Sequence, residues 1–452
     1  MYRSVNTVCL FLALFTIAAT FVASPQEDSI EDQFIKLLFQ PMDEFQNNLA
    51  EIDRQWHAEF TPMAIEVMSL APGAVGFHMV ELLQKRTGQA FGFDANKWFV
   101  WWWQQNQPAS ADYARFKSLL YGLIDPRFAT YFSLARKSRI KLDEVRWGGV
   151  AQDGIPPLRE PAMVTATEAT YLDDSNVVFG IAINGDARAY PKRILAWHEM
   201  FVDKIGGVDF AGVYCTLCGA VILYKTVHEG TLHRLGTSGF LYRSNKLMYD
   251  KDTQSLWNTT WGEPVIGPLA ERGIRLERSY LVTTTWGEWK RRHPATTVLS
   301  IDTGHQRNYA EGAAYREYFA TDELMFSVAA SDKRLPNKAE VLALTFPEHS
   351  ADTMAIHAAY LRENTIYANR LGELHFVVLT DTSGANRVYA SKGVSIASYD
   401  QRDTALDSEG TRWTLAENSL TTDGGRKLER LPAHRAFWFG WFAAYPDTIL
   451  IK

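Results

Sequence analysis

The cysteines at positions 215 and 218 are the residues whose type and spacing point most directly to chemistry. They lie in the segment Tyr214-Cys215-Thr216-Leu217-Cys218-Gly219, with strand-like residues on both sides. The glycine can adopt the left-handed backbone of a tight turn, so the pattern predicts two sulfurs presented by a turn between strands. The flanking residues do not indicate a helix that would lower a thiol pKa. No nucleotide-binding loop, G-x-S-x-G elbow or H-E-x-x-H motif is present.

A bound transition metal is our first interpretation of the thiol pair. Thiolate sulfur suits copper, zinc or iron, and such a site needs three or four ligands. His198 is the best candidate for a third ligand and His233 for a fourth, so we predict a metal set of Cys215, Cys218, His198 and His233. The sequence leaves open other ligands, namely His228, His434 and Met248.

Thiol–disulfide chemistry is the second interpretation. A C-x-x-C pair can close a small, strained and therefore reducible disulfide ring. Against this interpretation, no following helix is indicated that would lower a thiol pKa. After removal of the N-terminal segment described below, the chain also has no third cysteine to act as an internal resolving thiol.

A ligand-binding or hydrolytic scaffold without a metal is the third interpretation. Here His198 and Glu199 would form an acid–base pair. The segment Gly236-Thr237-Ser238-Gly239 places hydroxyls between glycines, where a ligand could approach the backbone closely. In a plainer alternative these hydroxyls satisfy the backbone of a tight turn, and nearby arginines form buried ion pairs. The predicted ligand-binding residues are Arg188, Thr237, Ser238, Tyr242 and Asn245.

The elements that must position these residues change character near position 147. Residues 25–146 carry apolar side chains at helical spacing, such as Phe34, Leu37 and Leu38, and so predict a small helical N-terminal region. Residues 147–452 carry short strand-like runs, and Asn184-Gly185 between two of them indicates a hairpin. Long helices do not alternate with these strands. We therefore expect an α+β protein whose large second domain is a mainly-β barrel or sandwich, not a doubly wound parallel sheet.

Several blocks of this second region occur in an order that resembles the secreted bacterial and archaeal family DUF3179, a domain of unknown function. The resemblance covers about residues 148–448 and implies membership of the family without implying a reaction. Family members commonly have proline after the first cysteine, where this chain has Thr216. The blocks are Asn184–Pro191, Trp197-His198-Glu199, Tyr214–Gly219, Gly236–Asn245, Leu247–Asp250, Ser255-Leu256-Trp257, Thr284–Trp289 and His434 with Phe437-Trp438-Phe439.

The first 24 residues have the features of a secretory signal peptide. Arg3 precedes the mostly apolar run Val8–Val22, which at about fifteen residues is short for a membrane span. Cleavage after Ser24 would remove Cys9 and leave only the C-x-x-C pair. We therefore predict a secreted or periplasmic protein that is not an integral membrane protein after cleavage, in a compartment where a disulfide can persist.

The overall composition narrows the possible partners. With 452 residues, 46% hydrophobic and 22% charged, the chain has the balance of an ordinary globular protein. The net charge of −6 argues against nucleic acid as a partner. An unknown small molecule or one transition metal is the expected partner of the cysteine site. A protein partner for the helical N-terminal region remains open.

Overall fold

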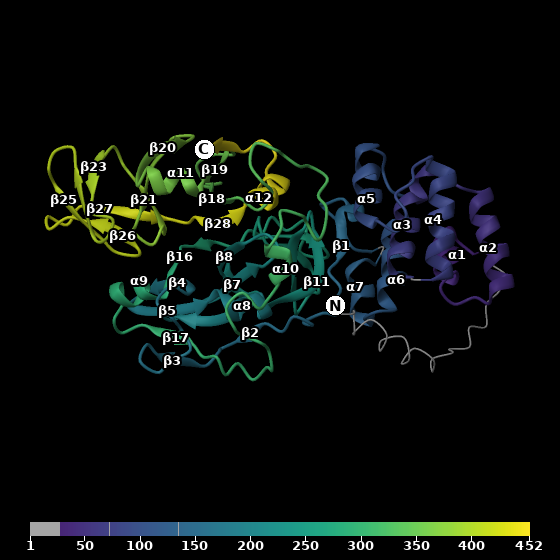
Figure 1. The fold of residues 1–452 in the computed structure, drawn as a ribbon, viewed down its shortest axis with the longest axis horizontal. Coiled ribbons are helices and arrows are strands. Elements are labelled where there is room, and N and C mark those ends of the chain that lie inside the picture. Colours follow the sequence, from purple (N-terminus) through teal and green to yellow (C-terminus); the bar gives the residue numbers. More distant parts are fainter. Residues whose placement is uncertain (1–27, 72, 134) are drawn as a thin grey trace.

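A computed structural model describes residues 28–71, 73–133 and 135–452, so the predicted signal peptide lies outside the described residues. The N-terminal part is helical, as the sequence predicts, and lies at one end of the molecule (Figure 1). No helix in the described ranges has the length and apolar character needed to cross a bilayer. This part comprises α1 (Ile30–Lys36), α2 (Met42–Arg54), η1 (Ala58–Phe60), α3 (Thr61–Leu70), α4 (Ala74–Thr87), α5 (Ala95–Gln104), α6 (Tyr113–Gly122), α7 (Pro126–Tyr131) and η2 (Leu142–Glu144).

The helices pack directly on a five-stranded sheet of the β-rich part. The ring of Phe240 lies 4.8 Å from that of Phe128 and 5.0 Å from that of Tyr121, so one apolar core joins sheet and helices. The division that we predict at residue 147 is therefore a change of secondary structure across a shared core. The strands, in sheet order, are β1 (Val145–Trp147), β11 (Leu235–Tyr242), β12 (Asn245–Asp250), β13 (Leu256–Asn258) and β14 (Glu263–Ile266).

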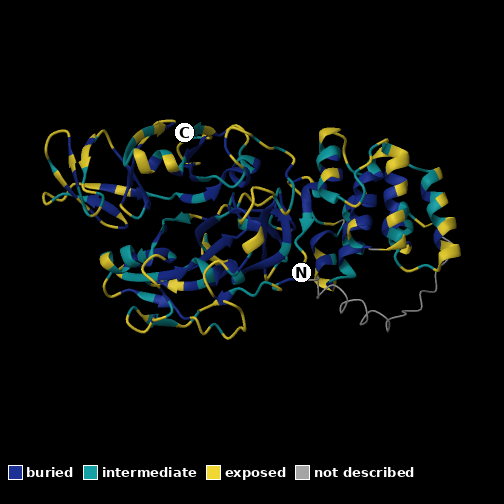
Figure 2. Ribbon diagram, in the orientation of Figure 1, coloured by how far each residue is buried: buried dark blue, intermediate teal, exposed yellow. Residues whose placement is uncertain are grey.

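Two further five-stranded sheets, the middle sheets, follow along the chain, and the central strands of the first are mostly buried (Figure 2). The predicted hairpin is present: Asn184 and Gly185 have φ of 50° and 86° between paired strands. One sheet is β15 (Arg278–Ser279), β8 (Ala220–Lys225), β7 (Val208–Cys215), β6 (Met200–Ile205) and β2 (Leu158–Arg159). The other is β16 (Val282–Thr285), β4 (Val177–Ile183), β5 (Asp186–Pro191), β17 (Thr297–Leu299) and β3 (Met163–Thr165). Smaller elements are α8 (Lys192–His198), β9 (Val227–His228), β10 (Thr231–Leu232), α9 (Trp286–Arg292) and α10 (Arg316–Phe319).

The C-terminal part consists of a four-stranded sheet and an eight-stranded sheet that curls into a nearly closed barrel. This confirms the predicted α+β class with a large mainly-β part. The four-stranded sheet is β28 (His434–Phe437), β18 (Glu340–Thr345), β19 (Thr353–His357) and β29 (Ile449–Ile451). The eight-stranded sheet is β20 (Ile366–Leu371), β21 (Leu374–Thr380), β22 (Asn386–Ala390), β27 (Lys427–Leu431), β26 (Ser419–Thr421), β25 (Arg412–Leu415), β24 (Thr404–Asp407) and β23 (Ile396–Tyr399). Two helices, α11 (Ala358–Glu363) and α12 (Trp438–Ala444), accompany these sheets.

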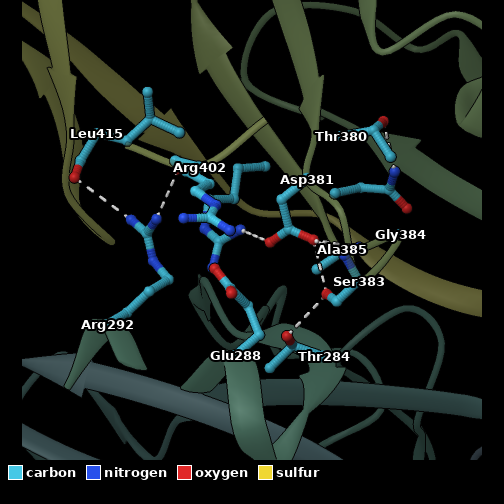
Figure 3. A network of polar contacts seen from close by, with 12 residues as sticks. Thr284, Glu288, Arg292, Thr380, Asp381, Ser383, Gly384, Ala385, Arg402 and Leu415 are labelled. Atoms are coloured by element: carbon cyan, nitrogen blue, oxygen red, sulfur yellow. Dashed lines mark hydrogen bonds and ion pairs between the residues drawn. The ribbon is translucent and has the colours of Figure 1, made fainter. Parts of the chain in front are cut away.

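A buried polar network joins the eight-stranded sheet to β16. Arg387 is fully buried and donates to Asp381 at 2.7 Å and to Glu417 at 2.8 Å. Asp381 also accepts from Ser383, whose hydroxyl lies 3.1 Å from that of Thr284 in β16 (Figure 3). Burial alone would raise the pKa of Glu417, but Arg387 and the other guanidinium groups hold that pKa well below its usual range. The Ser383–Thr284 contact, together with the ion pair between Arg292 and Glu417 at 3.1 Å, ties the C-terminal part to the middle sheets.

Candidate functional site

The two cysteines lie in the turn between β7 and β8, as predicted. Their sulfur atoms are 2.7 Å apart, and the backbone N–H of Cys218 donates to the carbonyl oxygen of Cys215 at 3.1 Å. Gly219 has a φ of 58°, and a Cβ atom there would lie 2.9 Å from the ring of Phe437. Glycine is thus required both by the left-handed backbone and by the close ring.

Both thiols are buried, Cys215 with 3% and Cys218 with 0% of its surface exposed. The Cys218 sulfur lies 3.2 Å from the carbonyl oxygen of Ser244, in the turn between β11 and β12. Burial, together with the neighbouring Cys215 thiol, raises the pKa of Cys218 well above its ordinary value. The Cys218 thiol therefore stays protonated at neutral pH.

Helix α12 covers the thiol pair. A Cβ atom on Gly440 would lie 3.1 Å from the Cβ of Cys218, so the helix backbone rests on that side chain. The β11–β12 turn holds the helix in place, because Asn245 donates to the Gly440 carbonyl and Arg243 to the Ala443 carbonyl, each at 3.1 Å. The thiol site is thus closed by a segment that lies more than two hundred positions further along the chain.

A buried ion pair lies beside the thiols. Lys246 donates to Glu199 at 2.9 Å, and their side chains are only 5% and 10% exposed. Tyr315 lies 3.5 Å from the other oxygen of Glu199. Burial raises the pKa of Tyr315, and the nearby Glu199 carboxylate and Cys215 thiol add to that rise. Glu199 and Tyr315 therefore face the same interior region as the thiols.

Two polar atoms in this region have no hydrogen-bond partner in the structure. They are the hydroxyl oxygens of Tyr214 and Thr216, which flank Cys215 in the chain and are buried. A buried hydroxyl without a partner costs about 1–3 kcal/mol, so such groups are uncommon in folded proteins. The cysteine turn therefore contains buried polar groups beside the apolar side chains that pack on it.

The backbone around the thiols is unusually strained. Four residues that are not glycine have positive φ there: Glu199 at 55°, Arg243 at 49°, Ser244 at 62° and Tyr315 at 53°. Each such residue costs about 1–3 kcal/mol, and such residues cluster at functional sites. The strain therefore supports this region as the candidate functional site.

The predicted acid–base pair of His198 and Glu199 is not assembled. The two ring nitrogens of His198 lie 2.9 Å from the Pro156 carbonyl oxygen and 2.5 Å from the Tyr309 hydroxyl. Burial lowers the pKa of His198 to about 4. Glu199 follows as the left-handed residue that ends α8, so its side chain points to Lys246 instead.

The predicted mixed cysteine–histidine metal set is not assembled either. His198 is occupied as described, and the ring of His233 lies 3.2 Å from an oxygen of Asp250. Throughout the described part of the chain, no group of three or more His, Cys, Asp or Glu side chains is arranged to hold a metal ion. Both histidines are held by partners outside the cysteine turn, so among the described residues the thiols lack a third and a fourth ligand. Of the other ligands left open, His434 lies against Trp441, Met248 is in the core, and His228 is in β9.

Of the predicted ligand-binding residues, only Asn245 reaches the thiol site. Thr237 and Ser238 are buried, and their hydroxyls donate to the Ile155 and Leu247 carbonyls at 2.8 and 2.6 Å. They satisfy backbone groups, as in the plainer alternative. The two remaining residues are Arg188, which pairs with Asp186 and Asp203, and Tyr242, which packs on Trp261.

Sequence reasoning missed Lys246, Tyr315 and the covering helix α12. Lys246 carried a usable signal, because a lysine directly before the apolar run Leu247-Met248-Tyr249 indicates a buried charge that needs a partner. Tyr315 carried none, and the block Phe437-Trp438-Phe439, which leads into α12, did not indicate that this helix covers the thiols, because both reach the thiols only through the tertiary fold.

The family comparison agrees with the order of the sequence blocks. The family model described as "Protein of unknown function (DUF3179)" matches residues 152–448. The chain belongs to the DUF3179 family. The DUF3179 segment contains the thiol pair, Glu199, Lys246 and α12, whereas the N-terminal helices precede it. No curated protein and no solved structure matches the chain.

Proposed function

We propose that this DUF3179 protein uses Cys215 and Cys218 as a redox-active thiol pair outside the cytoplasm. The observation that carries the proposal is the 2.7 Å separation of the two sulfurs in a turn that offers no further metal ligand. On oxidation, an S–S bond forms and the two thiols lose two protons and two electrons. A small oxidant such as hydrogen peroxide takes them up and leaves as two water molecules.

The surroundings of the pair favour a small reaction partner. Both thiols are buried and α12 rests on Cys218, so the disulfide of another folded protein cannot reach the pair while that helix is docked. Burial and, to a smaller extent, the nearby Glu199 carboxylate raise the pKa of Cys218, and Lys246 balances the charge of that carboxylate. The secreted or periplasmic location predicted from the sequence suits such a pair, because disulfides persist in oxidising compartments.

Metal binding by the two thiols alone remains a second proposal. Copper, zinc or iron would be held by Cys215 and Cys218, with only the carbonyl oxygen of Ser244 close to a sulfur. Zinc sites usually have four ligands of nitrogen or sulfur type, so this donor set fits a transition metal poorly. We therefore rank this proposal below the redox pair and derive no reaction step from it.

The test is a thiol titration combined with elemental analysis on the full chain, exported through its own N-terminus and purified without chelator. The protein is equilibrated in graded glutathione buffers, and free thiols and mass are measured after acid quenching. We expect both thiols to disappear together with the mass of two hydrogen atoms, at a potential above about −300 mV. Cys215→Ser and Cys218→Ser should each abolish the internal disulfide, and His198→Gln should leave the midpoint unchanged.

Two outcomes would count against the redox pair. About one copper, zinc or iron per chain, lost in the double serine variant, would identify a metal site instead. A midpoint well below about −300 mV would identify a disulfide that only stabilises the fold.

A further inference from the structure

A second feature, independent of the thiols, is an open depression of about 510 Å³ on the surface. Its lining includes Arg193 of α8 and, from the segment after β17, His305, Gln306, Arg307 and Tyr309. None of these residues has a role in the redox proposal.

The charges at the depression are unbalanced. Neither Arg193 nor Arg307 has a carboxylate oxygen within 4.0 Å in the described part of the chain. Arg193 donates to the Tyr171 carbonyl and Arg307 to that of Gln306, and the buried Nε of Arg193 has no partner. Burial is the main cause of the lowered pKa of His198 behind the depression, and the positive charge of Arg307 lowers it further. Two guanidinium groups therefore line the depression without a direct ion pair in the described part of the chain.

A chain of hydrogen bonds fixes the floor of the depression. Nδ1 of His198 must donate to the Pro156 carbonyl, because a carbonyl oxygen only accepts. Nε2 of His198 then accepts the Tyr309 hydroxyl proton, and the Tyr309 oxygen accepts from Thr303 at 2.6 Å. The loop is thereby tied to the core, so the depression is preformed and does not need a ligand to order it.

We propose that this depression binds a small molecule through an oxyanion, either a carboxylate or a phosphate group. Guanidinium groups present planar pairs of donors that match both oxyanions, and two guanidinium groups without a carboxylate partner, together with a histidine, can surround one ligand group. The proposal goes beyond the redox function and does not depend on it.

The test measures binding of inorganic phosphate and of citrate to the full chain by calorimetry in low-salt buffer, and the two probes distinguish the two ligand groups. We expect the Arg193→Gln/Arg307→Gln variant to bind the preferred anion roughly tenfold or more weakly. The control is Arg272→Gln, which alters an exposed arginine outside the depression and should leave binding unchanged.

A second readout uses the unaltered protein. The preferred anion should protect Arg193 and Arg307, but not Arg272, from modification by phenylglyoxal, as mapped by mass spectrometry. Binding that persists in the Cys215→Ser/Cys218→Ser variant would separate this site from the thiol pair. The proposal is overturned if neither anion binds at millimolar concentration, or if both arginines react equally fast with and without anion.

Discussion

The turn that carries the thiols makes a quantitative prediction for Gly219→Ala. The new methyl group would lie 2.9, 3.0 and 3.0 Å from three ring atoms of Phe437. Overpacking of this kind costs about 1–3 kcal/mol. The backbone φ of 58° adds about 1–2 kcal/mol for a residue that is not glycine. We therefore expect Gly219→Ala to lower the free energy of unfolding by about 2–5 kcal/mol.

The matched control is Gly273→Ala. Gly273 also has a positive φ, 68°, but a Cβ atom there would meet nothing within 4 Å. This variant should lose only the backbone part, about 1–2 kcal/mol. Urea unfolding of both variants under reducing conditions measures the difference, and a thiol reagent in native buffer should react faster with Gly219→Ala. Equal losses in the two variants would refute the close packing of Phe437 over the turn.

Two further predictions concern buried charge. Lys246→Met should destabilise the protein by about 3–5 kcal/mol, because the Glu199 carboxylate would stay buried without its partner. Urea unfolding measures this loss, and adding Glu199→Gln should restore part of it; no restoration would argue against the pair. Burial lowers the pKa of His434 from 6.5 to about 3, so between these values the unfolded state binds more protons and stability falls as the pH falls. The buried neutral His434 alone should lower the free energy of unfolding by about 2 kcal/mol at pH 5. The decrease in that free energy from pH 7 to pH 5 should therefore be smaller in His434→Gln. An unchanged slope in that variant would contradict the buried neutral imidazole.

Features encoded by neighbouring residues could be predicted from the sequence. The hairpin at Asn184-Gly185 and the thiol turn at Gly219 depend on local backbone preferences, and both are present. The helical spacing before residue 147 likewise predicted the α1–α7 region, because an amphipathic helix shows its buried face in its own sequence.

The environment of the thiols could not be predicted, because it depends on contacts between distant segments. Tyr309, more than a hundred positions after His198, occupies the ring nitrogen that we had assigned to a metal. Gly440, in a helix near the C-terminus, covers Cys218. Glu199 has a left-handed backbone that its residue type does not favour. Because of this turn in the backbone, the side chain of His198 contacts Tyr309 whereas that of Glu199 contacts Lys246.

The backbone strain supplies the strongest reason to regard the thiol pair as a functional centre and not as ordinary core. A two-residue hairpin turn of the type at Arg243-Ser244 normally carries asparagine and glycine, which adopt positive φ at little cost. Here the residues that adopt positive φ only at a cost in free energy each make a contact at the site. Arg243 holds α12, the Ser244 carbonyl faces Cys218, and Glu199 carries the buried ion pair. Because strained residues cluster at functional sites, these contacts support the proposal that the thiol pair is a functional centre.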